Sequence, residues 1–238
     1  MANIAEQTLA SIATEHHETV PVLERYHLDF CCKGKRTLSE ACTEKGLSVE
    51  EVIKNLKIST HANSFESTSF AEMNAGQLIR HILLHHHFYT RQSMPAIEER
   101  LNKVATKHGS RFPYMKEVLK YFSHLKNEMY LHMQKEEVIL FPRIKQVEAF
   151  AKHGQNGFDK NYIDGPVTIM ENEHDEAGTV MEQIRLLTND YTAPEDACTT
   201  FKVVLSELKR FEEGLHQHVH LENNLLFPMA KKLILSAV

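Results

Sequence analysis

The sequence predicts an all-α protein, with a small N-terminal helical domain followed by an up-down-up-down four-helix bundle. Three observations support this prediction. Only 9 glycines and 7 prolines interrupt 238 residues. Long stretches repeat apolar residues at spacings of three and four, which is the period of a helix. No stretch shows the strict apolar–polar alternation that is typical of a half-buried strand.

The N-terminal part, residues 1–58, is expected to hold short helices. Residues 37–40 and 48–51 fit the capping-box pattern, in which side chains bond free backbone N–H groups at a helix start. Residues 59–71 are rich in serine and threonine and lack periodicity, so we interpret them as a linker. Residues 72–238 then form the bundle.

The bundle is predicted from four long periodic segments joined by shorter connections. Glycine, proline and asparagine mark the expected separators at Gly109, at 154–165 and at 189–194. Proline removes a backbone donor, so we also expect a kink or a stop at three positions inside these segments. The four segments are 74–107, 112–151, 166–190 and 195–235, and the three prolines are Pro95, Pro142 and Pro228.

One phrase occurs twice, 86 residues apart: HMQKEEVILFPRIK begins at residue 132 and HVHLENNLLFPMAK begins at residue 218. In each copy a histidine and a glutamate interrupt an apolar stripe on one helix face. The first stripe is Leu125, Met129, His132, Glu136 and Ile139; the second is Leu208, Phe211, Leu215, His218, Glu222, Leu225 and Met229.

These paired interruptions indicate a metal site. Burying an unpaired carboxylate costs several kcal/mol, in rough terms. A single His-x-x-x-Glu could be a hydrogen-bonded pair inside the core. Two such pairs in register, both on the inward face, favour a shared metal instead.

Histidines on the preceding helices extend the repeat. His174 lies 44 residues before His218, and His87 lies 45 residues before His132. The stretch HILLHHHF leaves a choice, because periodicity allows His86 as well as His87, and the repeat spacing favours His87. The resulting unit is a helix with one histidine, a turn, and a helix with His-x-x-x-Glu.

Four histidines and two glutamates suit a pair of iron or manganese ions. Structural zinc prefers four ligands, and calcium takes only oxygen. If both glutamates bridge, each ion receives two nitrogens and two carboxylate oxygens, and an oxo or hydroxo bridge would leave one position open. A ferritin-like Glu-x-x-His exists at Glu171–His174, but its counterpart before His87 is Leu84.

The bulk composition excludes several other classes. A net charge of −5 argues against nucleic acid as the main partner. No apolar run is long enough to span a bilayer, and no secretion signal is visible at the N-terminus, so no membrane role is expected. Four cysteines do not form a disulfide framework, which predicts a cytoplasmic protein. The 16 histidines suggest metal binding.

Together, these residues resemble the repair-of-iron-centres family of iron–sulfur cluster repair di-iron proteins (ScdA/YtfE type). The bundle motifs resemble its hemerythrin-like domain, and DFCCKGKRTLSEAC at residues 29–42 resembles its ScdA-type N-terminal domain. The resemblance implies a cytoplasmic non-haem di-iron protein of the stress response. It implies six ligands: His87, His132, Glu136, His174, His218 and Glu222.

The resemblance further implies repair of clusters damaged by nitrosative or oxidative stress, with damaged iron–sulfur proteins as partners. Iron donation is our first hypothesis. The alternatives are an enzyme that reduces nitric oxide to nitrous oxide and a module that binds or senses nitric oxide or dioxygen. A homodimer through the N-terminal domain is compatible with the sequence.

Several further residues are candidates for chemistry. Cys31 and Cys32 could handle electrons, nitric oxide or iron, with or without Cys42, or could be small buried residues. Lys33 stands where the family has a second glycine; it would be strained at a positive φ, and its charge would lower a thiol pKa. Glu128 and Glu173 could orient a ligand or pass protons, although each could equally be a solvated residue.

The remaining candidate residues are expected not to take part in chemistry. Cys198 is interpreted as a structural residue early in the fourth segment. The Phe–Pro pairs at 141–142 and 227–228 are expected to close the end of the bundle. Four histidines next to ligand positions are interpreted as surface residues or as neighbours of the ligands: His85, His86, His216 and His220.

Overall fold

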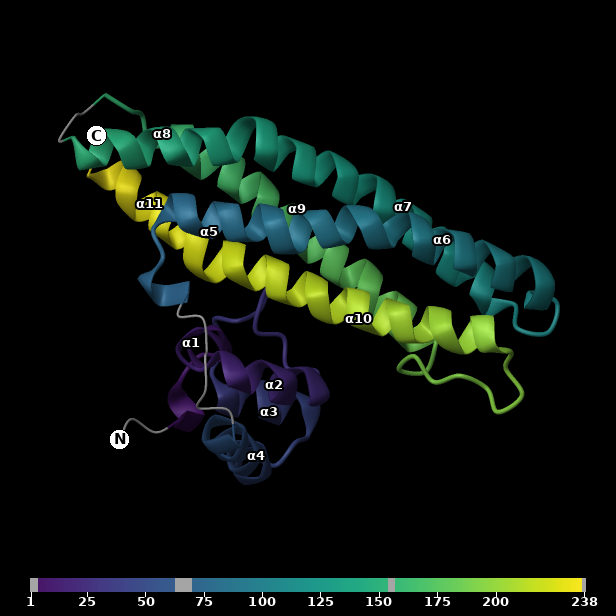
Figure 1. The fold of residues 1–238 in the computed structure, drawn as a ribbon. Helices are drawn as coiled ribbons and strands as arrows, with labels where there is room; N and C mark the ends of the chain where they lie inside the picture. The colour runs from purple at the N-terminus through teal and green to yellow at the C-terminus, as the bar shows by residue number, and fades with distance from the viewer. Residues whose placement is uncertain (1–3, 63–69, 154–156, 237–238) are drawn as a thin grey trace.

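The computed structural model describes residues 4–62, 70–153 and 157–236. These residues form helices and connecting loops, and apart from one isolated β-bridge between Thr8 and Thr37 the described ranges contain no strand pairing. The all-α prediction is confirmed. Figure 1 shows a long bundle with a compact N-terminal unit beside it.

The N-terminal unit consists of helices whose buried apolar residues join one hydrophobic cluster with part of the bundle. At the start of α3, Thr37 and Glu40 form the predicted capping box with both reciprocal bonds. At the start of α4, the Ser48 hydroxyl accepts the N–H of Glu51. The elements are η1 (Ile4–Glu6), α1 (Leu9–Glu15), η2 (His17–Thr19), α2 (Val20–Arg25), α3 (Leu38–Lys45) and α4 (Val49–Ala62).

The bundle is made of long helical rods, and three of them contain a π-helical turn. The first rod follows η3 (Phe70–Glu72) and comprises α5 (Ala75–His81), the π-helix η4 (Ile82–His87) and α6 (Phe88–His108). The second comprises α7 (Tyr114–Lys135), the π-helix η5 (Glu136–Leu140) and α8 (Phe141–Lys152). The third is α9 (Asn161–Leu187), and the fourth comprises α10 (Thr199–Leu221), the π-helix η6 (Glu222–Leu226) and α11 (Phe227–Leu235).

Some predicted boundaries were wrong. Helix α4 continues to Ala62, into the stretch interpreted as a linker, whose residues 63–69 lie outside the described ranges. Helix α9 begins at Asn161 and runs through Gly165 and Pro166, so the expected separator ends earlier. Pro166 is the sixth residue of α9, where it removes the backbone bond to the Tyr162 carbonyl without ending the helix, and that carbonyl accepts from Arg143 at 3.1 Å instead.

None of the three prolines stops its rod. Pro95 lies inside α6 without ending it. Pro142 and Pro228 lie in the first turns of α8 and α11, where each rod continues directly from its π-helix. Among the described residues, no helix is both long and apolar enough to cross a membrane.

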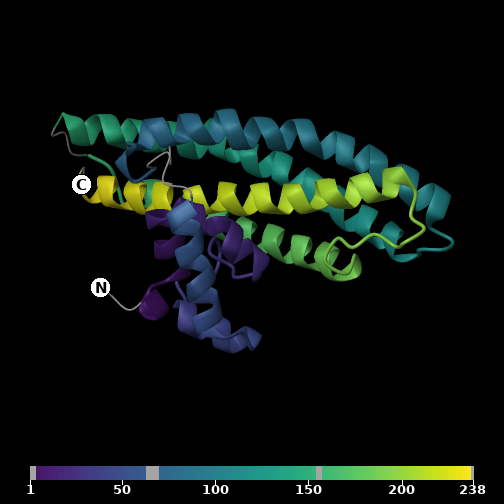
Figure 2. The same cartoon turned by 60° about the horizontal axis from the view of Figure 1, so that its bottom comes forward.

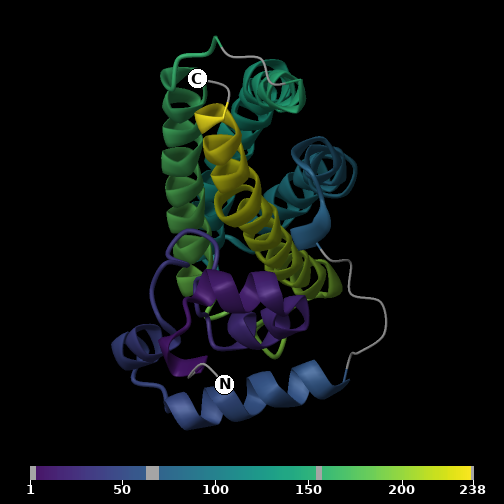
Figure 3. The ribbon, with the colours of Figure 1, turned by 90° about the vertical axis from the view of Figure 1, so that its left-hand side faces the viewer.

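The N-terminal unit packs against the fourth rod. The turned views in Figures 2 and 3 place this unit beside α10 and the start of α11, away from α7 and α8. The amide of Asn224 in η6 donates to the carbonyl of Phe30 at 3.0 Å, and His216 of α10 bonds Glu24 at 2.9 Å. The unit is therefore docked close to the part of the bundle that carries Glu222.

Candidate metal centre

The six residues predicted as ligands meet inside the bundle. Each rod supplies at least one of them, at the end of a regular helix, inside it or within a π-turn. None of the six side chains is more than about 2% exposed, although all are ionisable. They are His87, His132, Glu136, His174, His218 and Glu222.

Their ligand atoms fall into two overlapping groups. Within each group, one possible ligand atom from every residue lies within 4.8 Å of the others. Both glutamates belong to both groups, and each group takes one histidine from each copy of the repeat. The groups are His87, Glu136, His218 and Glu222, and His132, Glu136, His174 and Glu222.

The histidines all turn Nε2 toward the glutamates. The Nε2 atoms of His87 and His132 each lie 3.3 Å from Oε2 of Glu136. On the other side, Glu222 lies 3.2 Å from Nε2 of His174 and 3.1 Å from Nε2 of His218. This convergence of nitrogen and carboxylate oxygen is what a cation site requires.

Several atoms here are buried without a hydrogen bond among the described residues. These include both carboxylate oxygens of Glu136, Oε2 of Glu222 and Nε2 of His87. An unpaired buried polar atom costs about 1–3 kcal/mol, and more when charged. In addition, the Nε2 atoms of His132 and His174 are only 3.0 Å apart. Two nitrogen lone pairs at this distance would repel each other unless a positive charge lies between them. The residues present therefore fit a metal ion.

The electrostatics also favour a cation. Burial by itself lowers the pKa of His87, but hydrogen bonding and charge interaction with Glu136 and Glu222 outweigh it and raise the pKa to about 10. Burial likewise lowers the pKa of His132, and Glu136 with its acidic neighbours raises it to about 10. The two buried carboxylates thus attract positive charge, and a metal would have to displace protons from these imidazoles.

Three of the central histidines have hydrogen-bond partners outside the central group. Glu137 accepts from Nδ1 of His87 at 2.7 Å, and Glu173 accepts from Nδ1 of His132 at 2.9 Å. A proton on Nδ1 leaves the Nε2 lone pair free for a metal. Glu173 hydrogen-bonds one of the central histidines and its role in orienting a ligand stays a prediction, whereas Glu137 was not predicted.

Asn223 holds the third histidine. Its Oδ1 lies 2.9 Å from Nδ1 of His174, and its amide nitrogen lies 3.4 Å from the carbonyl of Cys31 in the N-terminal unit. Sequence reasoning missed this residue. Its position one residue after Glu222 is a weak signal, because the helix alone does not show that it points toward α9.

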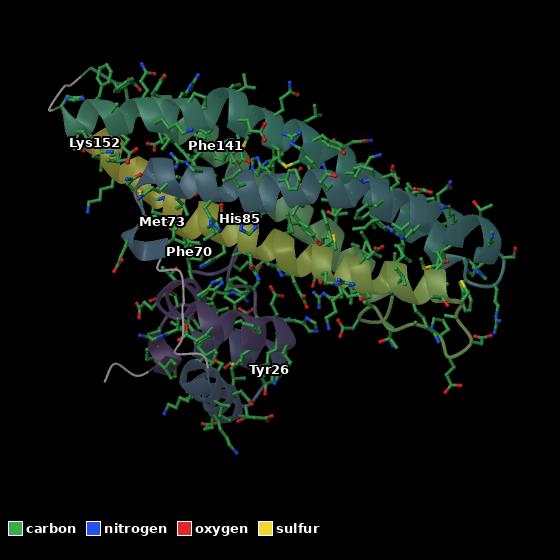
Figure 4. The ribbon with its side chains drawn as sticks, viewed as in Figure 1. Tyr26, Phe70, Met73, His85, Phe141 and Lys152 are labelled. Carbon is green, nitrogen blue, oxygen red and sulfur yellow. The ribbon has the colours of Figure 1, made fainter. Side chains whose placement is uncertain are left out.

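The phenylalanines of the repeated phrase lie at the centre and do not close the bundle end. The ring of Phe141 stacks on His87, with centroids 5.6 Å apart. The ring of Phe227 is parallel to His174 within 1°, with centroids 5.9 Å apart. Figure 4 labels Phe141 among the bundle side chains. Each phenylalanine thus covers the histidine of its own copy, and the prediction for these pairs was wrong.

Two family models match this chain. The model of the "Hemerythrin HHE cation binding domain" matches residues 78–230, and the model "ScdA_N", described as a domain of unknown function (DUF542), matches residues 5–59. The first covers more than half of the chain and contains all six central residues.

Curated relatives match nearly the full length. A protein of Escherichia coli O8 (strain IAI1) named "Iron-sulfur cluster repair protein YtfE" is 34% identical over 225 residues, which is 94% of this chain and 96% of that protein. The chain belongs to the YtfE family of hemerythrin-domain proteins. YtfE proteins of Shigella boydii serotype 4 (strain Sb227) and Enterobacter sp. (strain 638) are 33% and 32% identical over the same shares. The resemblance inferred from the sequence is confirmed.

The cysteine pair of this YtfE-family chain lies in a turn built around Asp29. The carboxylate oxygen Oδ1 of Asp29 accepts the backbone N–H groups of Cys31, Cys32 and Lys33 at 2.9–3.2 Å. Lys33 does not have a positive φ, so the turn needs no glycine there. Gly34 is required instead, because a Cβ at that position would lie 2.3 Å from the carbonyl oxygen of Phe30.

The Cys31 thiol is not activated. Its hydrogen bond with Cys32, together with burial, raises its pKa well above the usual value. The expectation that the Lys33 ammonium would favour a thiolate is therefore wrong for Cys31. Cys42 of α3 is buried, and burial also raises its pKa.

The other predicted residues have mixed outcomes. Glu128 is exposed and lines a small pocket with Glu173 and His132, but among the described residues no hydrogen bond links it to a ligand. His220 is not a surface residue, because it is 2% exposed and packs edge-on against Phe30. Cys198 is exposed at the start of α10, with its sulfur 3.3 Å from His108.

Proposed function

We propose that this protein holds two iron ions and supplies iron to iron–sulfur clusters damaged by nitrosative or oxidative stress. The observation that carries the proposal is the sharing of Glu136 and Glu222 by two buried ligand groups. Curated relatives over 94% of the chain are named iron–sulfur cluster repair proteins, which supports the same role. Damaged iron–sulfur proteins in the cytoplasm would be its partners.

The ligand chemistry supports iron and its release. Imidazole and carboxylate suit iron, whereas tightly held structural zinc favours thiolates, which neither ligand group contains. When bound, the ions would supply Lewis acidity and redox chemistry. The chain's own contribution is to keep the protons of His87 and His132 on Nδ1, in hydrogen bonds to Glu137 and Glu173, and to exclude water with Phe141.

Metal content tests the two-ion arrangement. The iron-reconstituted protein should hold two irons per chain. Either Glu136→Ala or Glu222→Ala alone should loosen both irons, because each glutamate serves both groups. Glu171→Ala is a matched control, since Glu171 precedes His174 by one turn but pairs with Lys231 at 3.0 Å. Loss of a single iron with the other held normally would contradict bridging, and one zinc without iron would reject the proposal.

A repair assay tests iron donation. The iron-loaded protein is mixed with an enzyme whose cluster was removed or nitrosylated, and the return of enzyme activity is followed. We expect faster recovery than with the same amount of free ferrous iron, and no such gain with Glu136→Ala. Recovery no better than with free iron would count against donation.

The same protein distinguishes the alternative functions. Four protein ligands for each ion leave room for a small ligand. Nitrous oxide formed during turnover with nitric oxide and a reductant would favour nitric oxide reduction. Tight, reversible binding of nitric oxide or dioxygen without turnover would favour a binding or sensing role.

A further inference from the structure

A second group of histidines lines a cavity where the N-terminal unit meets the bundle. This cavity, which we call the junction pocket, has a volume of about 380 Å³. Five histidines line it, and His17 comes from the N-terminal unit while the others come from the first and fourth rods. They are His17, His81, His85, His86 and His220. None of the six central ligands lines this pocket among the described residues.

Two of these histidines lie face to face on the first rod. The ring centroids of His81 and His85 are 4.4 Å apart, with a tilt of 33° between the rings. Residues four apart lie on one face of a helix, and two histidines at this spacing form a common metal-binding pair. Figure 4 shows His85 and Phe70 on the side of the bundle that faces the N-terminal unit.

The pair is connected to the metal centre through His86. The ring of His86 lies 5.7 Å from that of His81 and stacks on the ligand His218, with centroids 5.6 Å apart. An ion held at the pair would therefore be separated from the central ligand set by one stacked ring.

The lining favours a transition metal over other ligands. The described lining residues include no carboxylate, which excludes a calcium or magnesium site, since those ions need oxygen ligands. Burial lowers the pKa of His81 and of His17, so both imidazoles are neutral near pH 7 and have a free lone pair. Neutral imidazole is a preferred ligand of divalent iron, cobalt, nickel, copper and zinc.

We propose that the junction pocket binds one divalent first-row transition-metal ion through His81 and His85. The cavity provides space for water molecules to complete the coordination. The alternative is that the histidines only fill space as aromatic rings, as the edge-on contact of His81 with Phe70 at 4.9 Å would allow. Packing alone requires no metal affinity, so a measurement of metal binding distinguishes a metal site from aromatic packing.

Nickel is a suitable probe, because it favours imidazole and can be counted separately from iron. The full-length protein is first loaded with iron, desalted and then titrated with Ni²⁺, with both metals measured per chain. We expect one Ni²⁺ per chain with no loss of iron, and loss of that equivalent in the double variant His81→Gln, His85→Gln. The result does not depend on how many irons the centre holds, so it stands apart from the proposed function.

Three comparisons complete the test. A double variant at two exposed histidines, His124→Gln with His153→Gln, should retain the nickel equivalent. Cys32→Ser should also retain it, which separates the pocket from the Asp29–Cys31–Cys32 group. If the double variant binds less iron, the exposed His85→Gln alone is used. An unaltered protein that takes up no nickel, or a His81/His85 variant that keeps its equivalent, would overturn the proposal.

Discussion

Replacing Glu173 with glutamine should weaken metal binding in one half of the centre only. Glu173 accepts the Nδ1 proton of His132 at 2.9 Å and also pairs with Lys135. The hydrogen bond from His132 is the main cause that lowers the pKa of Glu173 to about 2, so the side chain is a carboxylate at neutral pH. Glutamine keeps the shape and an acceptor oxygen but removes the charge.

The size of the effect follows from the geometry. Hydrogen bonds to charged groups contribute about 1.5–3 kcal/mol, against about 0.5–1.5 kcal/mol for neutral ones. Losing an outer partner of a metal-bound histidine typically weakens metal binding about 10- to 100-fold. Because the Glu173 side chain is 27% exposed, water partly compensates and the lower end applies. We expect roughly tenfold weaker binding, or about 1.4 kcal/mol, at the ion held by His132 and His174.

Competition with a chelator measures this effect. The metal-loaded protein is exposed to increasing chelator, and release is followed for the unaltered chain, Glu173→Gln and Glu128→Gln. Glu173→Gln should release metal in two steps, with the weaker step shifted about tenfold. Glu128→Gln should behave as the unaltered chain, because Glu128 lines the same pocket without bonding a ligand. Equal shifts in both variants, or none in Glu173→Gln, would refute this account of the site.

Further predictions concern the Phe227 ring that stacks on His174, the hydrogen bond from Asn223 to the N-terminal unit, and the cysteine thiols. Phe227→Leu and Phe122→Leu should each lower the free energy of unfolding by about 1–3 kcal/mol, but only Phe227→Leu should also lower metal affinity in a chelator titration. Asn223→Ala should reduce metal affinity roughly tenfold and speed amide hydrogen exchange in residues 30–33, since it removes the bond to the Cys31 carbonyl. Alkylation followed by mass spectrometry at pH 7–8 should modify the exposed Cys198 well before Cys31, whose pKa is raised; comparable rates would contradict a buried Cys31 thiol.

The six central residues could be predicted because the chain contains the site twice. A single His-x-x-x-Glu is ambiguous, but two copies in register constrain each other, and the structure brings all six residues together. The residues that hydrogen-bond the central histidines from outside the group are not marked by a repeated motif. Glu137 follows Glu136 directly, yet it serves His87 on another rod. Its role depends on how two rods face each other, and periodicity along one helix does not contain that information.

Sequence patterns also did not predict how the N-terminal unit docks on the bundle. His216 and His220 appeared to be neighbours of ligand positions on an exposed helix face. In the structure that face is covered, because His216 bonds Glu24 and His220 packs on Phe30. Contacts between two domains depend on the shapes of both surfaces. The sequence of one helix shows only that a face carries polar residues, and it does not show what covers that face.

The π-helical turns explain the most systematic error. The first stripe was expected to continue inward from Glu136 to Ile139, but Ile139 is 43% exposed whereas Leu140 is 1% exposed. The fourth rod shows the same one-residue shift, because Ala230 is 1% exposed in place of the half-buried Met229. A π-turn inserts one residue into the helical repeat, so every later side chain rotates to a new face.

The same turn gives the repeated phrase a physical role. In the second and fourth rods the π-helix begins at a glutamate of the central group, and the N–H of the following phenylalanine bonds that glutamate's carbonyl five residues back, from Phe141 to Glu136 and from Phe227 to Glu222. The next residue is proline, which has no N–H and whose ring would crowd the carbonyl of a regular turn. A widened turn accommodates the proline and also aims the phenylalanine ring at the ligand histidine of its own copy. Replacing Pro142 or Pro228 with alanine should therefore favour a regular turn, move the ring off the histidine and weaken metal binding, whereas Pro95→Ala, far from any π-turn that carries a glutamate, should not.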